Sequence, residues 1–263
     1  MAANTVNPDG SYVKSELHAH IYTIEFHHPQ GNALTTTMLG DLVHEIGHAA
    51  HSMDTHVILL RSSGSAFCGG ASFTELLQIE TEAEGIRFFN GVANLILAMR
   101  RCSKFIIACV HGKCVGGGVG IAAAADYAIA MEGADIKLSE LAIGIGPFVV
   151  GPAIERKTGL SAFSQLAIDA GNWRNADWAR RKGIYAELHP SVESMEESIS
   201  RLSDSLAHYS AEATAETKKM IWQNTEHWEQ LLPERAAISG RLVIGATAKT
   251  YLDKYREESN MPK

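Results

Sequence analysis

Two glycine-rich turns are the parts of this sequence whose residue types and spacing most clearly allow chemistry. The first is residues 67–71 (Phe-Cys-Gly-Gly-Ala), and the second is residues 111–118 (His-Gly-Lys-Cys-Val-Gly-Gly-Gly). Glycines let the backbone approach a ligand closely, and free N–H groups at a helix start lie at the positive end of the helix dipole. Two such turns facing each other would form a two-donor oxyanion hole. Glycines needed only for strand–helix packing would explain one turn well and two turns less well.

A histidine string offers a second kind of chemistry. Residues 44–48 (His-Glu-Ile-Gly-His) have the spacing of a zinc-peptidase helix, in which two histidines bind the metal and the glutamate is a general base. However, Ile46 belongs to an apolar stripe of the predicted helix, whereas the two histidines and His51 share a different face. No third ligand follows at the metzincin spacing, and a chain with 12 histidines matches such a string easily by chance. We therefore interpret these histidines as a solvated helix face and expect no metal site.

Two further motifs are explained better by packing than by a ligand. Cys109, His111 and Cys114 have part of the spacing of a metal site, but no fourth ligand follows suitably, and buried cysteines commonly pack as small apolar side chains. Residues 118–123 (Gly-Val-Gly-Ile-Ala-Ala) fit the glycine pattern of a dinucleotide site. That site also needs an acidic residue about 20 positions further on, and Glu132 comes too early. A nucleotide site is therefore the weaker alternative.

The composition is that of an ordinary globular protein and excludes several classes of function. Of the 263 residues, 46% are hydrophobic and 20% are charged, which excludes a disordered or fibrous chain. The formal net charge of −7 argues against nucleic-acid binding. The 4 cysteines are too few for a disulfide scaffold, residues 1–19 contain no apolar signal sequence, and no uncharged stretch is long enough to span a bilayer. We therefore expect a cytoplasmic protein that binds neither nucleic acid nor membrane.

The elements that must position these turns are those of an α/β fold. Hydrophobic alternation over residues 11–26 predicts two antiparallel strands with a turn near Glu16. Further strands are predicted at residues 56–61, 105–110 and 127–131, and helices at residues 39–50, 73–81, 85–102 and up to about 125. Strands that alternate with helices in this way predict a largely parallel sheet.

The periodicity changes after about residue 186. From residue 192 to residue 256 only helical spacing is present, with Pro190 and Pro233 as breaks. The chain is therefore predicted to have an α/β core over residues 1–190 and a helical C-terminal extension over residues 191–263.

Several motifs, taken in chain order, are similar to those of one enzyme family. They are residues 31–34 (Gly-Asn-Ala-Leu), 66–73 (Ala-Phe-Cys-Gly-Gly-Ala-Ser-Phe), 110–112 with 116–118, 139–144 (Ser-Glu-Leu-Ala-Ile-Gly), 176–184 and 251–254 (Tyr-Leu-Asp-Lys). Through them the sequence resembles the crotonase superfamily, the enoyl-CoA hydratase/isomerase family, over nearly its whole length. The resemblance implies a crotonase fold of repeated ββα units with a helical C-terminal trimerisation region. It also implies an acyl-CoA substrate, assembly as a homotrimer or homohexamer, and no permanently bound cofactor, because coenzyme A is part of the substrate.

The resemblance also assigns roles to individual residues. The backbone N–H groups of Ala71 and Gly117 would hold the thioester oxygen while a carbanion at C2 becomes an enolate. Glu140 matches the family's second catalytic glutamate and would be the acid/base. Its apolar neighbours, among them Leu141 and Ile143, should desolvate its carboxyl and raise its pKa toward a value useful for a base. The residues expected to contact substrate or CoA are Ala71, Ser72, Phe73, Thr74, Gly117, Tyr251 and Lys254.

The sequence departs from the family pattern at three positions. Gly120 stands where family hydratases carry the first catalytic glutamate, Ser72 replaces a common Asp, and Thr74 replaces a common Lys. Hydration in the family uses two carboxylates to hold and split one water, whereas a Δ3-Δ2-enoyl-CoA isomerase shuttles a proton with one. The sequence therefore leaves enoyl-CoA hydratase (a lyase) and isomerase both open. The candidate replacement acids are Glu75, Glu80, Glu82 and Glu84. The alternative is a catalytically idle acyl-CoA-binding or scaffold homologue, which the presence of Glu140 argues against.

Overall fold

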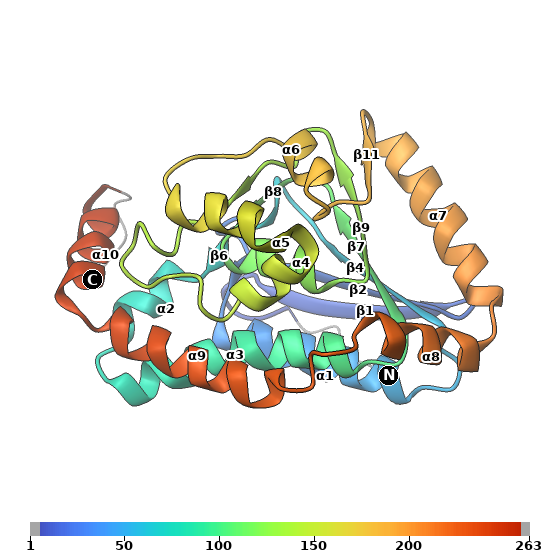
Figure 1. The fold of residues 1–263 in the computed structure, drawn as a ribbon, viewed down its shortest axis with the longest axis horizontal. Coiled ribbons are helices and arrows are strands. Elements are labelled where there is room, and N and C mark those ends of the chain that lie inside the picture. Colours follow the sequence, from blue (N-terminus) through green and yellow to red (C-terminus); the bar gives the residue numbers. More distant parts are fainter. Residues whose placement is uncertain (1–5, 259–263) are drawn as a thin grey trace.

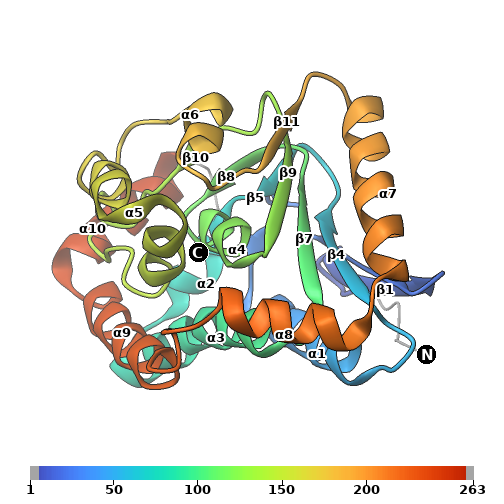
Figure 2. The same ribbon diagram turned by 45° about the vertical axis from the view of Figure 1, so that its right-hand side comes forward.

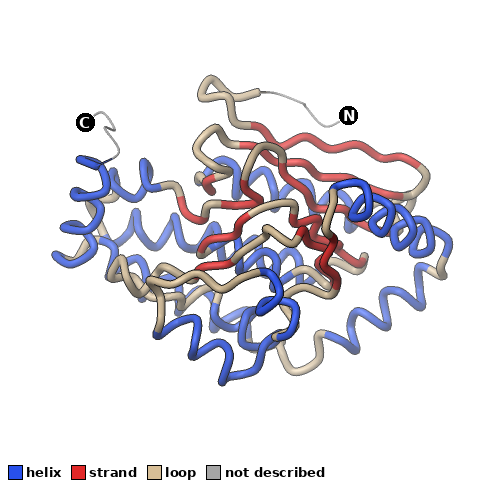
Figure 3. The backbone as a smooth tube through the Cα atoms, turned by 90° about the horizontal axis from the view of Figure 1, so that it is seen from above, coloured by secondary structure: helices blue, strands red, loops and turns tan. Residues whose placement is uncertain are grey.

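The computed structural model describes residues 6–258. Its centre is a six-stranded sheet in the order β1-β2-β4-β7-β9-β11, which runs through the middle of the molecule (Figure 1). The strands are β1 (Tyr12–His18), β2 (Ile21–His27), β4 (Val57–Ser62), β7 (Phe105–Val110), β9 (Tyr127–Met131) and β11 (Glu187–His189). β1 and β2 pair antiparallel, and every other pair in this sheet is parallel. Figure 3 shows the β1–β2 hairpin at one rim of the molecule, near the N-terminal end.

Two smaller sheets hold the glycine-rich turns, which follow the carboxyl ends of β4 and β7. The first sheet contains β10 (Ile136–Lys137), β8 (Lys113–Val115) and β5 (Ala66–Cys68), and the second pairs β3 (Ala33–Leu34) with β6 (Gly70–Ala71). All of these pairs are parallel. Because β5 and β8 are neighbours, the two turns are held side by side.

Helices cover both faces of the main sheet. The helices of the described residues are α1 (Thr36–His51), α2 (Phe73–Gln78), α3 (Glu82–Arg101), α4 (Gly117–Ala124), α5 (Gly151–Ile168), α6 (Ala176–Arg181), α7 (Val192–His208), α8 (Ala211–Ile221), α9 (Trp228–Val243) and α10 (Ala246–Glu258). Figure 2 shows α7 on one side of the strands and α4 on the other. None of these helices combines the length and the apolarity that crossing a bilayer requires.

Strand β4 shows why the predicted strands are continuously apolar. Ile58 and Leu60 pack in the main hydrophobic core. Val57 and Leu59, which point to the opposite face, pack in a second cluster with Ile199 of α7. A strand buried on both faces has no polar side to alternate with. The predicted parallel α/β core is therefore confirmed.

The C-terminal helices fold back onto the core, as Figure 1 shows for α9 along α3 and α10 near α2. The backbones of α3 and α9 touch, because a Cβ on Gly85 would lie 2.6 Å from the carbonyl oxygen of Gly240. The rings of Phe73 on α2 and Tyr255 on α10 are 4.4 Å apart between centroids. The predicted helical C-terminal region is confirmed, whereas the division between residues 1–190 and 191–263 stays a prediction.

Two local predictions are wrong. Strand β1 continues through Glu16, and the hairpin turns at Ala19 and His20, which have φ values of +46° and +68°. A two-residue hairpin turn usually has Asn or Gly at positions with positive φ, and this turn has Ala and His instead. Helix α9 begins at Trp228 and continues through Pro233. Proline removes one backbone hydrogen bond, but the packing of α9 on α3 holds the helix together.

Candidate active site

The two glycine-rich turns line a single pocket. Gly70 and Ala71 of the first turn and Gly116 and Gly117 of the second form part of its wall, together with Glu140. The pocket has about 580 Å³ of empty space, counted to its open mouth. The rest of the wall consists mainly of apolar side chains from α2, α3 and the segment that follows Glu140. A mostly apolar cleft with a few convergent polar groups is typical of a small-molecule site.

The pairing of β3 with β6 orients the first turn. The Ser72 N–H donates to the Leu34 carbonyl oxygen at 2.9 Å. Successive N–H groups of an extended strand point to opposite sides, so the Ala71 N–H points away from Leu34. Gly70 has a φ of +88°, and a Cβ there would lie 2.8 Å from a carbonyl oxygen of the second turn and 3.6 Å from the Gly117 nitrogen. Glycine is therefore required for the two turns to lie this close.

The second turn presents the amino-terminal end of α4 to the pocket. Gly116, with a φ of +50°, is the N-cap, and no side chain caps the helix. The first N–H groups of a helix have no intrahelical acceptor, so the Gly117 N–H is a donor at the positive end of the helix dipole.

The adjacent glycine has a different role. A Cβ on Gly118 would lie 2.5 Å from the Cys68 carbonyl oxygen, which leaves no room for any side chain. A Cβ on Gly117 would meet the Cδ1 end of the Leu34 side chain at 2.9 Å, and that side chain can move. Gly118 is therefore needed for packing, and Gly117 is the one that lines the pocket.

Glu140 lies against the second turn. A Cβ on Gly116 would lie 2.9 Å from its Oε1 atom, and its Oε2 atom is buried with no hydrogen-bond partner within the described residues. Burial raises the pKa of Glu140 to about 7. Its carbonyl oxygen accepts hydrogen bonds from the N–H groups of Ile145 and Gly146 at 2.9 and 3.0 Å, which closes the loop that holds it. The expected rise in pKa is present, although Leu141, expected among the desolvating neighbours, is exposed.

The position of the family's first catalytic glutamate is filled by another side chain. Gly120 lies in α4, and a Cβ there would lie 2.5 Å from Cγ1 of Val150. Val150 is the residue before α5, is buried, and lines the pocket. A carboxylate side chain at position 120 therefore does not fit while Val150 is in place.

The four candidate replacement acids lie outside the described pocket wall. Glu75 accepts hydrogen bonds from the backbone N–H and hydroxyl at the start of α1, at 2.9 and 2.7 Å. Glu84 forms the capping box of α3. Glu80 and Glu82 are exposed. Among the described residues, Glu140 is therefore the only acidic side chain on the pocket wall.

The predicted contact residues around α2 lie in different environments. Ala71 and Phe73 line the pocket. Ser72 is buried, and its hydroxyl oxygen accepts a hydrogen bond from a backbone N–H of α2 at 3.3 Å, so it caps that helix. Thr74 is exposed and donates to the side chain of Gln30 at 3.3 Å. The structure therefore brings only the first two of these residues to the pocket.

The predicted C-terminal contact residues are on the surface of α10. Tyr251 and Lys254 are exposed and do not belong to the described pocket wall. Lys254 lies 3.8 Å from the carboxylate of Glu258. The aromatic residue of α10 that reaches α2 is Tyr255, through its contact with Phe73.

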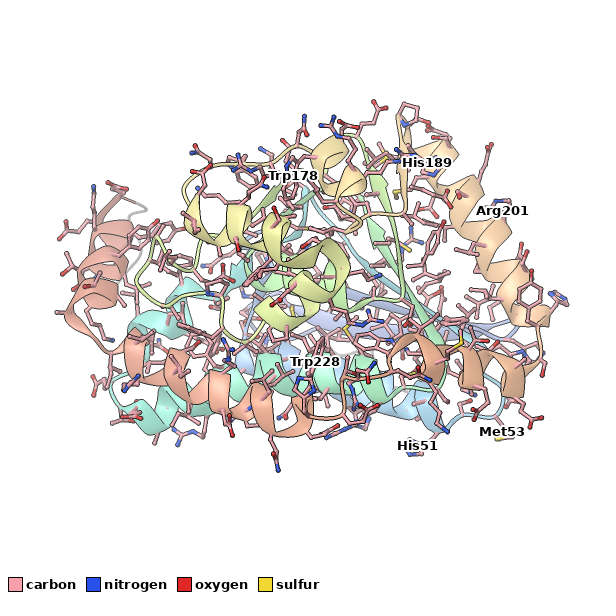
Figure 4. The ribbon with its side chains drawn as sticks, in the orientation of Figure 1. His51, Met53, Trp178, His189, Arg201 and Trp228 are labelled. Atoms are coloured by element: carbon pink, nitrogen blue, oxygen red, sulfur yellow. The ribbon has the colours of Figure 1, made fainter. Side chains whose placement is uncertain are left out.

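The histidine string on α1 is not gathered into a metal site. His44 and His48 are exposed, and Figure 4 shows His51 at the outer edge of the molecule. Glu45 is buried and accepts a hydrogen bond from the Tyr22 hydroxyl at 2.6 Å. In the part of the chain that the structure describes, no three His, Cys, Asp or Glu residues are grouped to hold a metal. The three histidines lie on an exposed face of the helix, as interpreted, whereas Glu45 between them is buried.

The other two motifs have structural roles. Cys109 and Cys114 are buried, and burial raises the pKa of both thiols, that of Cys109 to about 12. His111 forms a hydrogen bond with the Gly64 carbonyl oxygen at 2.9 Å. Residues 118–123 form the buried body of α4.

Sequence reasoning did not assign most of the apolar pocket wall, and Val150 and Ser239 are two examples. Val150 follows the glutamate segment closely, and its apolar neighbours could have suggested a buried position. Ser239 of α9 lines the pocket, but no motif around it carries a signal.

Comparison with known proteins identifies the family. The family model described as "Enoyl-CoA hydratase/isomerase" matches residues 16–255, so the chain belongs to this family, within the crotonase superfamily. The family acts on acyl-CoA thioesters.

Individual relatives carry different names. The chain is 27% identical over 197 residues to the 2,3-dehydroadipyl-CoA hydratase of Escherichia coli (strain K12), covering 74% of this chain and 75% of that protein. It is 23% identical over 210 residues to the peroxisomal Delta(3,5)-Delta(2,4)-dienoyl-CoA isomerase of Arabidopsis thaliana, covering 74% of each. The crystal structure of an enoyl-CoA hydratase from Bacillus halodurans superposes with a TM-score of 0.86 at 21% identity, covering 93% of this chain and 100% of that one. This likeness shows the crotonase fold.

Proposed function

We propose that this protein is an enoyl-CoA isomerase, which moves the double bond of an acyl-CoA thioester by transferring a proton between C2 and C4. The observation that carries the proposal is the single carboxyl on the described pocket wall. Glu140 is that carboxyl, and Val150 fills the space beside Gly120. A proton shuttle needs one carboxyl, whereas hydration in this family uses two.

The chemistry follows from the two turns and Glu140. The thioester oxygen of a 3-enoyl-CoA accepts hydrogen bonds from the N–H groups of Ala71 and Gly117. The Glu140 carboxylate removes a proton from C2, and the electron pair of that C–H bond moves into a dienolate whose negative charge lies on the thioester oxygen. Preorganised donors stabilise that charge more than they stabilise the neutral thioester. Protonated Glu140 then delivers the proton to C4, the conjugated C2–C3 double bond forms, and the carboxylate is regenerated.

The pKa of Glu140 supports this dual role. A carboxyl with a pKa of about 7 is a stronger base than an ordinary glutamate and still releases its proton readily near neutral pH. The unpartnered Oε2 atom leaves one oxygen available to a substrate proton. A catalytically idle acyl-CoA binder would have no need for such a costly buried carboxyl.

The test follows the absorbance of the conjugated thioester with matched panels of 3-enoyl-CoA and 2-enoyl-CoA. We expect a gain of absorbance from 3-enoyl-CoA and no 3-hydroxyacyl-CoA from 2-enoyl-CoA. Glu140→Gln should abolish turnover and leave CoA-ester binding within about tenfold, because it removes the base and leaves the oxyanion donors. Glu140-dependent addition of water to 2-enoyl-CoA would show a hydratase instead. Binding without turnover of either panel would show the idle homologue.

The remaining expectations stay predictions. They concern contacts of the CoA moiety with Ser72, Thr74, Tyr251 and Lys254, assembly as a homotrimer or homohexamer, and a cytoplasmic location. Coenzyme A would enter as part of the substrate, and none of the proposed steps requires a permanently bound cofactor.

A further inference from the structure

The backbone donors of the pocket make the product of the proposed reaction sensitive to water. The double bond of a 2-enoyl-CoA is conjugated with the thioester. Hydrogen bonds from the Ala71 and Gly117 N–H groups to the thioester oxygen therefore draw electrons away from C3 and favour attack by water there. A protein that stops at isomerisation needs a group that keeps water away from this carbon.

Val150 and Glu140 pack against α4 one helical turn apart. A Cβ on Gly116 would lie 2.9 Å from Glu140 Oε1, and a Cβ on Gly120 would lie 2.5 Å from Val150 Cγ1. The Gly120 N–H donates to the Gly116 carbonyl oxygen at 3.1 Å, so these glycines are one turn apart. Residues four apart share a helix face and are separated by about 6 Å along the axis. The valine methyl groups and the carboxyl therefore lie along the same side of α4.

The Val150 side chain separates position 120 from the pocket. Val150 is buried and belongs to the pocket wall, whereas Gly120 is not part of the described wall. Gly117, whose N–H is the proposed donor, lies three residues before Gly120, a separation of about 4.5 Å along the helix. The C3 atom of a thioester held at that donor is two bonds from the thioester carbon. Val150 thus covers the part of α4 next to the reacting carbons.

The Val150 side chain is apolar and held in place. Its carbonyl oxygen accepts a hydrogen bond from the Ile154 N–H at 3.2 Å, and the Gly151 N–H donates to the Pro147 carbonyl oxygen at 2.9 Å. These bonds fix the backbone at the start of α5, and a β-branched side chain has little freedom to rotate. A buried water typically needs about three polar partners. The methyl groups of Val150 supply none, so they leave no stable position for a water beside Gly120.

We propose that Val150 is a specificity-determining residue that keeps water away from C3, so that the reaction stops at isomerisation. The inference rests on the proposed function and adds the reason why the 2-enoyl-CoA product is released without being hydrated. In the reaction that Val150 prevents, the Glu140 carboxylate takes a proton from water, the water oxygen forms a bond to C3, and the C2–C3 π electrons move into an enolate. C2 then takes the proton from Glu140, which gives a 3-hydroxyacyl-CoA.

The test places a hydroxyl at position 150. Val150→Ser makes room for a water and supplies a hydrogen-bond partner, whereas Val150→Thr supplies the hydroxyl and keeps the shape of valine. Each variant is incubated with 2-enoyl-CoA, and 3-hydroxyacyl-CoA is measured by chromatography and mass spectrometry. We expect both variants to form it at least about tenfold faster than wild type, the factor that one buried hydrogen bond to the water corresponds to. Adding Glu140→Gln to either variant should abolish the product.

Val92→Ser is the matched control. Val92 is buried and lines the pocket from α3, so the same substitution adds space and a hydroxyl on a different wall. Equal hydration by this control would mean that any polar opening admits water, and it would overturn the role of Val150. If Val150→Ser does not fold, the result with Val150→Thr decides. A Val150 variant that binds a saturated acyl-CoA thioester and forms no 3-hydroxyacyl-CoA also overturns the role of Val150.

The outcomes separate this inference from the proposed reaction. If wild type converts 3-enoyl-CoA and the Val150 variants do not hydrate 2-enoyl-CoA, the isomerase is supported and the role of Val150 is rejected. If wild type does not convert 3-enoyl-CoA and the variants hydrate 2-enoyl-CoA through Glu140, the isomerase is rejected and the exclusion of water by Val150 is supported. Hydration of 2-enoyl-CoA by wild type rejects both.

Discussion

Replacing Glu140 by Gln should change how the stability of the protein depends on pH. In the folded protein burial raises the pKa of this carboxyl to about 7, from an ordinary value of 4.5 that it would regain in the unfolded chain. Between these two values the folded state holds a proton that the unfolded state releases. The free energy of unfolding of wild type therefore falls as pH rises through this interval. The neutral amide of Gln has no such dependence.

The magnitude follows from the two pKa values. A pKa difference of one corresponds to a free energy of about 1.4 kcal/mol. The rise from 4.5 to about 7 therefore corresponds to about 3 kcal/mol of unfolding free energy. The difference in unfolding free energy, wild type minus Glu140→Gln, should fall by about this amount between roughly pH 4.5 and pH 8 and stay level on either side. The variant is thus expected to gain stability relative to wild type at alkaline pH while losing activity.

Denaturant unfolding over a pH series, at one fixed protein concentration, measures this difference. The fixed concentration matters because assembly of subunits would shift the midpoint by mass action. Glu82→Gln, which makes the same change at an exposed position of α3, is the matched control and should keep wild-type turnover. A difference between wild type and Glu140→Gln that stays constant over the whole pH range would refute the reasoning.

The same pKa predicts the pH dependence of catalysis. Only the carboxylate form of Glu140 removes a proton from C2, so kcat/KM should rise with pH through about 7 and level off above it. Initial rates with a 3-enoyl-CoA over a pH series measure this. A kcat/KM that falls as pH rises through the same range would mean that the protonated form is the active one.

Three glycine substitutions give further predictions. Gly117→Val should fold and lose at least about 10²-fold in turnover, because a side chain there displaces the donor or the substrate from the oxyanion site; near-wild-type rates would remove Gly117 from that site. Gly118→Ala should lower the thermal midpoint measured by circular dichroism, since its Cβ would lie 2.5 Å from the Cys68 carbonyl oxygen. Gly120→Glu should be destabilised and gain no hydratase activity, because Val150 occupies the space that its side chain would need. The double variant with Val150→Ala should recover part of the stability. Hydration of 2-enoyl-CoA by the single variant would contradict this account.

The sequence predicted the parts of the site that depend on local backbone chemistry. Consecutive glycines predict turns in which the backbone lies close to another segment or to a ligand. In the structure, Gly70 lies close to the backbone of the second turn, next to Gly117. Glu140 was assigned through its match to the family's second catalytic glutamate, and the apolar residues around it predicted that its pKa would be raised.

The remaining features depend on contacts that no local pattern encodes. The side chain that fills the space at Gly120 comes from Val150, the residue before α5, and the packing of α5 against α4 makes the two neighbours. In the sequence, Ser239 is an ordinary polar residue of a predicted helix. It lines the pocket because α9 packs on α3. The hairpin turn at Ala19 and His20 was mispredicted because both residues adopt a backbone conformation that their types rarely favour.

The contact between Gly85 and Gly240 has a consequence for how the chain is made. Residues of the pocket wall extend from Leu34 to Ser239, so most of the wall is synthesised well before α9 leaves the ribosome. Until then α9 does not yet cover Phe89 and Val92 of α3, which are buried in the finished protein. An incomplete chain that ends before α9 would thus present an open apolar groove to chaperones or to other nascent chains. The last helices complete the wall of the pocket, so the pocket is enclosed only near the end of the synthesis of the chain.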